Sequence, residues 1–64
     1  MQSEVRLYRE GNSFVDLIQI KNEVQTSYQV RKWLGKESLA HSHHDTLRSA
    51  KKAFSTLVQK EMAK

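Results

Sequence analysis

The chain lacks cysteine and proline, and its 64 residues include only 2 glycines. Without cysteine it forms no disulfide and none of the cysteine-based structural zinc sites, so apolar packing or a partner must stabilise it. It also lacks the run of about 20 apolar residues that crosses a bilayer as a helix. Residues 1–4 do not have the charged-then-apolar order of a signal peptide. We therefore expect one small cytoplasmic domain, residues 1–64, with no membrane segment.

Catalytic motifs are missing as well. The sequence has no glycine-rich phosphate loop, no HExxH pair and no nucleophile elbow. A ligand pocket of the usual ~300 Å³ or more would consume most of the core of so small a domain. We expect no enzyme activity and no cofactor.

Acidic residues become scarce toward the C-terminus. The formal net charge is +4, yet residues 1–45 contain six Lys or Arg and six Asp or Glu. Residues 46–64 contain five cations and a single acid, Glu61. A basic helix on a neutral body is the pattern of a polyanion binder. The alternative is a solvated helix face that is basic for solubility.

Three segments alternate or are rich in β-branched and aromatic residues, which predicts strands at about 4–10, 13–20 and 24–33. A Gly11-Asn12 pair between the first two predicts a two-residue hairpin. For the second turn, the apolar pattern favours three residues, 21–23, with Asn22 in the left-handed conformation. This register places Asp16 opposite Tyr28.

The predicted register gives the sheet two different faces. The apolar face, which we expect the helix to cover, carries Val5, Leu7, Phe14, Ile18, Ile20, Val24, Thr26, Tyr28 and Val30. The other face carries Arg6, Tyr8, Val15, Leu17, Gln29, Arg31 and Trp33. Aromatic rings among arginines suit nucleic acid, because rings stack on bases while guanidinium groups bind phosphate.

The C-terminal segment has the period of an amphipathic helix at about 46–62. Its apolar stripe consists of Leu47, Ala50, Phe54, Leu57 and Val58. Asp45 or Thr46 can cap the first turn, and Glu61 suggests that the last turn overhangs the sheet into water. Residues 38–43 fit either a fourth strand or a loop. The fold class is therefore α+β: a three- or four-stranded antiparallel sheet packed on one C-terminal helix.

The histidines at 41, 43 and 44 form a second polar cluster. On a strand, His41 and His43 share a face, and Asp45 could add a third metal ligand. A solvated edge without metal and a pH-sensitive phosphate contact are the alternatives. We expect no metal here.

Three segments carry a family resemblance. They are the strand-like 14–20, the basic segment 31–36 (Arg-Lys-Trp-Leu-Gly-Lys) and the helix segment from Ser49 through Phe54 to Lys60. Together they resemble the WGR-type domain of DNA-dependent poly(ADP-ribose) polymerases and small bacterial proteins, which implies a curved sheet with a closing helix. The name-giving Trp-Gly-Arg reads Trp-Leu-Gly here, followed by Lys36. The AP2-type and integrase arm-binding-type DNA binders share the same outline.

These observations predict a nucleic-acid-binding module, for DNA rather than RNA, centred on Trp33. The expected contact residues are Arg31, Lys32, Trp33 and Lys36, with Arg6 and Tyr8 beside them and Arg48, Lys51 and Lys52 on the helix. The alternative is a protein-interaction or inhibitor domain, including a homodimer, on the same sheet face, because Trp, Tyr and Arg are common hot spots. A third reading has Trp33 wrapping around the sheet edge into the core.

Overall fold

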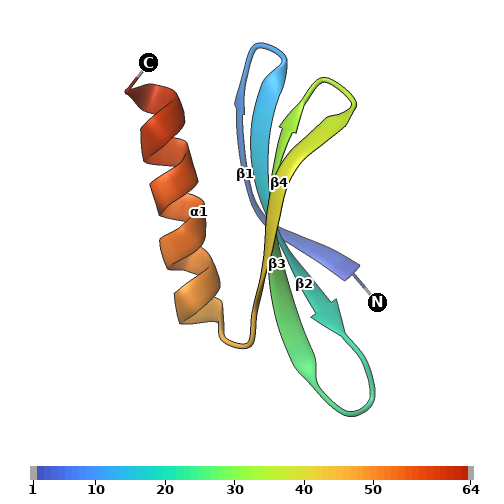
Figure 1. Cartoon of the computed structure of the whole chain (residues 1–64). Helices are drawn as coiled ribbons and strands as arrows, with labels where there is room; N and C mark the ends of the chain where they lie inside the picture. Colours follow the sequence, from blue (N-terminus) through green and yellow to red (C-terminus); the bar gives the residue numbers. More distant parts are fainter. Residues whose placement is uncertain (1, 64) are drawn as a thin grey trace.

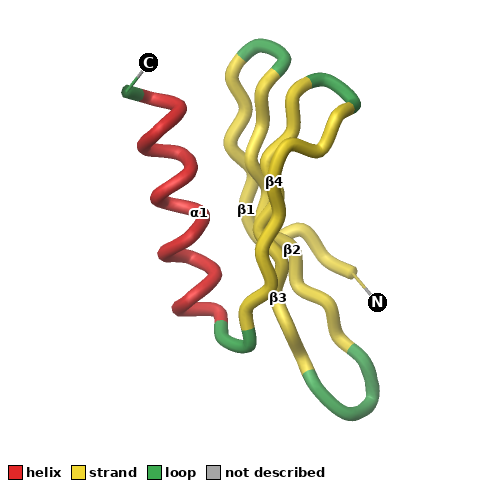
Figure 2. The backbone as a smooth tube through the Cα atoms, viewed as in Figure 1, coloured by secondary structure: helices red, strands yellow, loops and turns green. Residues whose placement is uncertain are grey.

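A computed structural model describes residues 2–63 as four strands followed by one helix (Figure 1). Their bounds are β1 Gln2–Glu10, β2 Ser13–Lys21, β3 Thr26–Leu34, β4 Glu37–His44 and α1 Leu47–Met62. The strands form a single antiparallel sheet in the order β1-β2-β3-β4. The helix lies along one side of this sheet (Figure 2). The α+β class is confirmed, and the ambiguous segment after Gly35 is a strand.

The first hairpin has the predicted two-residue turn. Glu10 pairs with Ser13, and Gly11 adopts a positive φ of 59° that a residue with a side chain would rarely take. The predicted pairs of Arg9 with Phe14 and Leu7 with Asp16 are also present. Further along, an irregularity between Glu4 and Arg6 shifts the register. Ile18 therefore lies opposite Glu4, and the predicted pair with Val5 is wrong.

The second turn differs from the prediction. Lys21 pairs with Thr26, so the turn has four residues, and Val24 is 92% exposed rather than part of the sheet. The Asn22 side chain accepts hydrogen bonds from the backbone N–H of Val24 at 2.9 Å and of Gln25 at 2.8 Å. Asn22 thus shapes the turn through its side chain, and no non-glycine residue between 2 and 63 has a positive φ.

This extra residue reverses the face that β3 presents relative to β2. Asp16 now lies opposite Arg31 rather than Tyr28. The helix covers Val15 and Leu17, which are fully buried and which we had predicted on the uncovered face. The side chains predicted under the helix at Leu7, Phe14, Ile18 and Ile20 consequently lie on the opposite face, since side chains alternate along a strand.

The core lies between the sheet and α1. It is formed by Val15, Leu17 and Val30 from the sheet and Ala50 and Phe54 from the helix. Partly buried side chains extend it: Tyr8, Tyr28, Leu47, Ala53, Leu57 and Val58. The predicted helical stripe therefore does face the sheet.

Both ends of α1 are fixed by side chains. The Thr46 hydroxyl caps the N-terminus by accepting a hydrogen bond from Ser49 N–H at 3.2 Å. Near the C-terminus, Glu61 is 7% exposed and forms an ion pair with Lys32 of β3. The prediction that this last turn overhangs into water is wrong, because the ion pair holds it on the sheet. The described helix is neither long nor apolar enough to span a membrane.

Candidate nucleic-acid interface

The sheet face opposite α1, here called the open face, carries the aromatic and charged residues of interest. The register places on it Leu7, Arg9, Phe14, Asp16, Ile18, Gln29, Arg31, Trp33, His41 and His43. Of the residues predicted for the uncovered face, Gln29, Arg31 and Trp33 do lie here. No other element among residues 2–63 packs over this face as α1 does over the other.

An aromatic pair occupies the two central strands of this face. Phe14 of β2 and Trp33 of β3 lie opposite each other, with ring centroids 5.9 Å apart and planes inclined by 13°. Both residues are half-buried. The indole Nε1 is buried and has no hydrogen-bond partner among the described residues. Trp33 is therefore packed on the open face rather than inserted in the core beneath α1.

Arg31 ties this aromatic pair to a carboxylate. Its guanidinium carbon lies 5.3 Å from the centre of the Trp33 ring, within the range of a cation–π contact. The same group donates two hydrogen bonds to Asp16, at 3.0 Å from Nε and 2.7 Å from Nη2. These bonds raise the pKa of Arg31, and the pairing neutralises its charge locally.

A shallow pocket of about 340 Å³ adjoins Phe14 on the β1 side of the face. Its lining combines the apolar side chains of Leu7 and Phe14 with the cation Arg9 and the carboxylates of Glu4 and Asp16. Glu4 is the exposed carboxylate of this lining, whereas Asp16 is 6% exposed and both of its oxygens accept hydrogen bonds from Arg31.

Exposed cations lie at the end of the face where the aromatic pair sits. Gly35 N–H donates to Asn12 C=O at 2.7 Å, so the β1–β2 and β3–β4 turns are joined there. This contact places Lys36, an exposed residue of the β3–β4 turn, close to the aromatic end of the face. Arg9 is exposed opposite Phe14. Arg9 and Lys36 are thus exposed cations near the aromatic end of this face.

The histidines divide between the two faces. His41 and His43 lie beside Arg31 and Gln29 on the open face, as predicted for a strand, and His43 Nε2 is 3.4 Å from Gln29 Nε2. The His44 ring is on the helix side, between the hydroxyls of Ser42 at 2.7 Å and Ser49 at 2.9 Å. Among residues 2–63 no three potential ligands, Asp45 included, come together as a metal site.

Three predicted contact residues lie away from Trp33. Lys32 is on the helix side and is paired with Glu61. Tyr8 is also on the helix side, next to the core, and donates to Glu10 at 2.9 Å. Arg6 pairs with Leu17, so it belongs to the same side. The reversed register explains the errors at Arg6 and Tyr8, because they follow from assigning β2 to the wrong face, whereas Lys32 falls on the helix side in either register.

The cations of α1 form a separate surface. Arg48, Lys51 and Lys52 are exposed, and the helix has one acid, Glu61, which is buried. Lys52 also lines a hollow between α1 and β4. These cations lie on the side of the sheet opposite Trp33, so a short ligand cannot touch them and Trp33 together.

Sequence reasoning missed Phe14, Leu7 and Arg9 as members of the site. The signal was present: β2 is apolar at successive positions from Phe14 to Ile18, apart from Asp16. A strand that is apolar on both faces does not indicate by itself which face the helix covers.

We compared the chain with protein-family models, curated proteins and solved structures, and none of them matched it.

Proposed function

We propose that this protein is a nucleic-acid-binding module that uses its open face. The observation that carries the proposal is the Phe14–Trp33 pair, set on the two central strands with Arg31 against the indole. Aromatic side chains on a sheet surface bind bases by stacking, and this contact tolerates many sequences. Arg9 and Lys36 supply phosphate contacts at the same end of the face.

The shape of the site favours single-stranded over double-stranded ligands. The rings are half-buried, so a base that stacks on them must come to them unpaired and unstacked. The bases of a single strand are free to do so, whereas those of a duplex are stacked on one another. We take single-stranded DNA as the ligand to test first, with RNA as the comparison.

Arg31 has a different role from the one predicted from sequence. Because Asp16 neutralises it, it offers little net charge to phosphate. Its place against the indole instead holds the Trp33 ring in position and keeps the aromatic pair ordered before a ligand arrives, which lowers the cost of binding.

Matched variants on the two surfaces test this proposal. Phe14→Leu removes one ring of the pair, and we expect it to weaken binding of a dye-labelled single-stranded 12-mer about tenfold. Lys51→Gln removes an exposed helix cation, and its affinity should stay within about twofold, a change typical of a cation outside the site. Fluorescence anisotropy gives both affinities, and circular dichroism checks that each variant folds. A loss only in Lys51→Gln would place the site on the helix, and equal losses in the two variants would contradict a site confined to the open face.

Protein interaction through the open face is the second candidate. The observation that favours it is the mixture of Leu7, which is 51% exposed, with the aromatic pair and the neutral Asp16–Arg31 pair. Such a face is apolar and carries little net charge, as expected of an interface core. A homodimer formed this way would persist at high salt in sedimentation experiments, whereas phosphate binding weakens steeply.

A further inference from the structure

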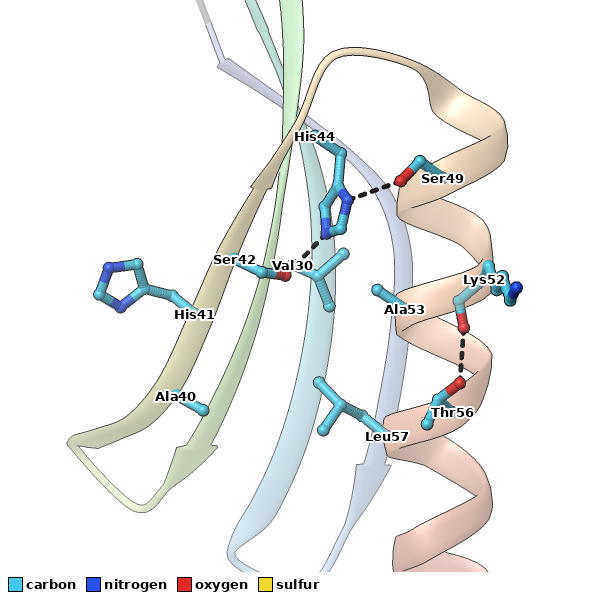
Figure 3. A pocket seen from close by; sticks show the side chains of 10 residues that line it. All are labelled: Val30, Ala40, His41, Ser42, His44, Ser49, Lys52, Ala53, Thr56 and Leu57. Carbon is cyan, nitrogen blue, oxygen red and sulfur yellow. Dashed lines mark hydrogen bonds between the residues drawn. The ribbon is translucent and has the colours of Figure 1, made fainter.

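A groove separates α1 from β4, on the side of the sheet away from the open face. Its volume is about 460 Å³. Figure 3 shows Leu57 of the helix on one side and Val30 of β3 at its floor, with the small side chains of Ala40 and Ala53 leaving the space between them unfilled. The His44 ring, bonded to Ser42 and Ser49, closes one end.

The groove runs beside a sheet edge. β4 is the last strand in the sheet order, and among the described residues it pairs only with β3. The register irregularity between Lys32 and Trp33 leaves regular pairing from Ala40 to His44. The outer edge of this stretch can therefore accept the backbone hydrogen bonds of one more strand.

We propose that this edge and groove bind an extended peptide in which apolar and acidic residues alternate. A fifth strand along β4 would alternate its side chains between the two faces. One set would enter the apolar groove against Val30 and Leu57. The other set would lie next to His41 and His43, which are exposed on the open face. Figure 3 shows the His41 ring pointing away from the groove, as this arrangement requires.

Charge complementarity selects acidic residues for the second set. On the open face this set would lie beside the exposed imidazoles of His41 and His43, next to Arg31 and Gln29 of β3, and imidazole N–H groups donate to carboxylates. The nearest exposed acids in the sequence are Glu37 and Asp45, just outside the stretch from Ala40 to His44. A second copy of this chain fits less well, because its β4 would bring the same histidines, rather than a row of carboxylates, beside His41 and His43. This proposal does not depend on nucleic-acid binding.

The test uses a dye-labelled octapeptide in which valine alternates with glutamate. We expect it to bind, and we expect two control peptides to fail: one with lysine in place of glutamate, and one with N-methylated backbone amides, which cannot pair with β4. NMR hydrogen exchange should show new protection at backbone amides within residues 40–44. Binding that survives N-methylation, or exchange protection elsewhere, would overturn the proposal.

Protein variants separate the groove from general charge effects. His41→Ala removes an imidazole donor beside the acidic set and should weaken the glutamate peptide roughly fivefold, whereas Lys51→Glu, on the helix and outside the groove lining, should change its affinity by less than about twofold. Ala40→Phe should fill the groove and abolish binding, with circular dichroism confirming the fold. Three results would contradict the proposed occupant. The first is no peptide binding to the unmodified protein, and the second is a dimer through β4 in sedimentation. The third is an oligonucleotide that displaces the peptide and changes NMR chemical shifts only in this groove.

Discussion

At the residue scale, the most informative contact is the pair between Asp16 and Arg31. Asp16 is 6% exposed, so its carboxylate depends on the two guanidinium hydrogen bonds. We predict that Asp16→Asn lowers the free energy of unfolding by about 1–3 kcal/mol, because it leaves a partly buried cation without its counter-charge. Urea denaturation measures this. The exposed Glu23→Gln is the control and should change stability by less than about 0.5 kcal/mol. An equal effect of both variants would show that the pair adds nothing specific.

Tyr8 gives a prediction for high pH. The hydrogen bond to Glu10, with burial and the charges of Glu10 and Glu61, raises the pKa of Tyr8. A raised pKa means that the fold favours the protonated phenol, so its contribution to stability is complete below the ordinary tyrosine pKa and is lost as pH rises through the folded value. Tyrosinate absorbance should show a late-titrating component that is lost in Tyr8→Phe and shifts to lower pH in Glu10→Gln. An unchanged titration in Glu10→Gln would contradict this cause.

At the element scale, the two ends of α1 can be tested separately. Thr46→Ala removes the N-cap that accepts from Ser49 N–H, and should cost about 1 kcal/mol of unfolding free energy. The matched control is Thr56→Ala, whose hydroxyl donates to the Lys52 carbonyl within the helix. That change should be neutral or slightly stabilising, since alanine is the better helix former. Denaturant midpoints compare the two, and a cost at both positions would count against a specific cap.

The other end of α1 is held by the ion pair of Lys32 with Glu61, whose side chains are 19% and 5% exposed. We predict that Glu61→Gln lowers the unfolding free energy by about 2 kcal/mol, because it leaves Lys32 buried beside a neutral partner. The double variant Lys32→Met, Glu61→Leu should recover most of this loss, since apolar packing replaces the pair. A double variant as unstable as Glu61→Gln would show that the pair itself, rather than its isolated charge, supports the helix.

The same elements show how far the sequence alone leads. The helix, its stripe and the Gly11-Asn12 turn follow from local signals, namely the 3.6-residue period and the conformational freedom of glycine. The second turn does not, because a three-residue and a four-residue loop are both compatible with Asn22. Only tertiary contacts choose between them: the four-residue loop sets Asp16 opposite Arg31 and Phe14 opposite Trp33. The ion pair of Glu61 with Lys32 also forms between elements that are distant in sequence, which local patterns do not reveal.

At the scale of the whole molecule, the corrected length of the second turn keeps the candidate site on the face opposite α1 but changes the residues that form it. Trp33 and Arg31 lie on the open face as predicted, although β2 presents Phe14 and Asp16 beside them rather than Val15 and Leu17. With the corrected register, this face carries an ordered aromatic pair, and its exposed cations are Arg9 and Lys36. The corrected register also separates this face from the cations of α1, so the two surfaces make distinct predictions about where nucleic acid binds.

The most direct test of the central claim is the fluorescence of Trp33, the single tryptophan of the chain, during titration with single-stranded DNA at two salt concentrations. We predict that the DNA changes its emission. With two phosphate contacts, from Arg9 and Lys36, the logarithm of affinity should fall against the logarithm of salt with a slope of about −1.4. Binding that leaves the emission unchanged would place the DNA on α1, and an absence of binding at low salt would contradict a nucleic-acid function.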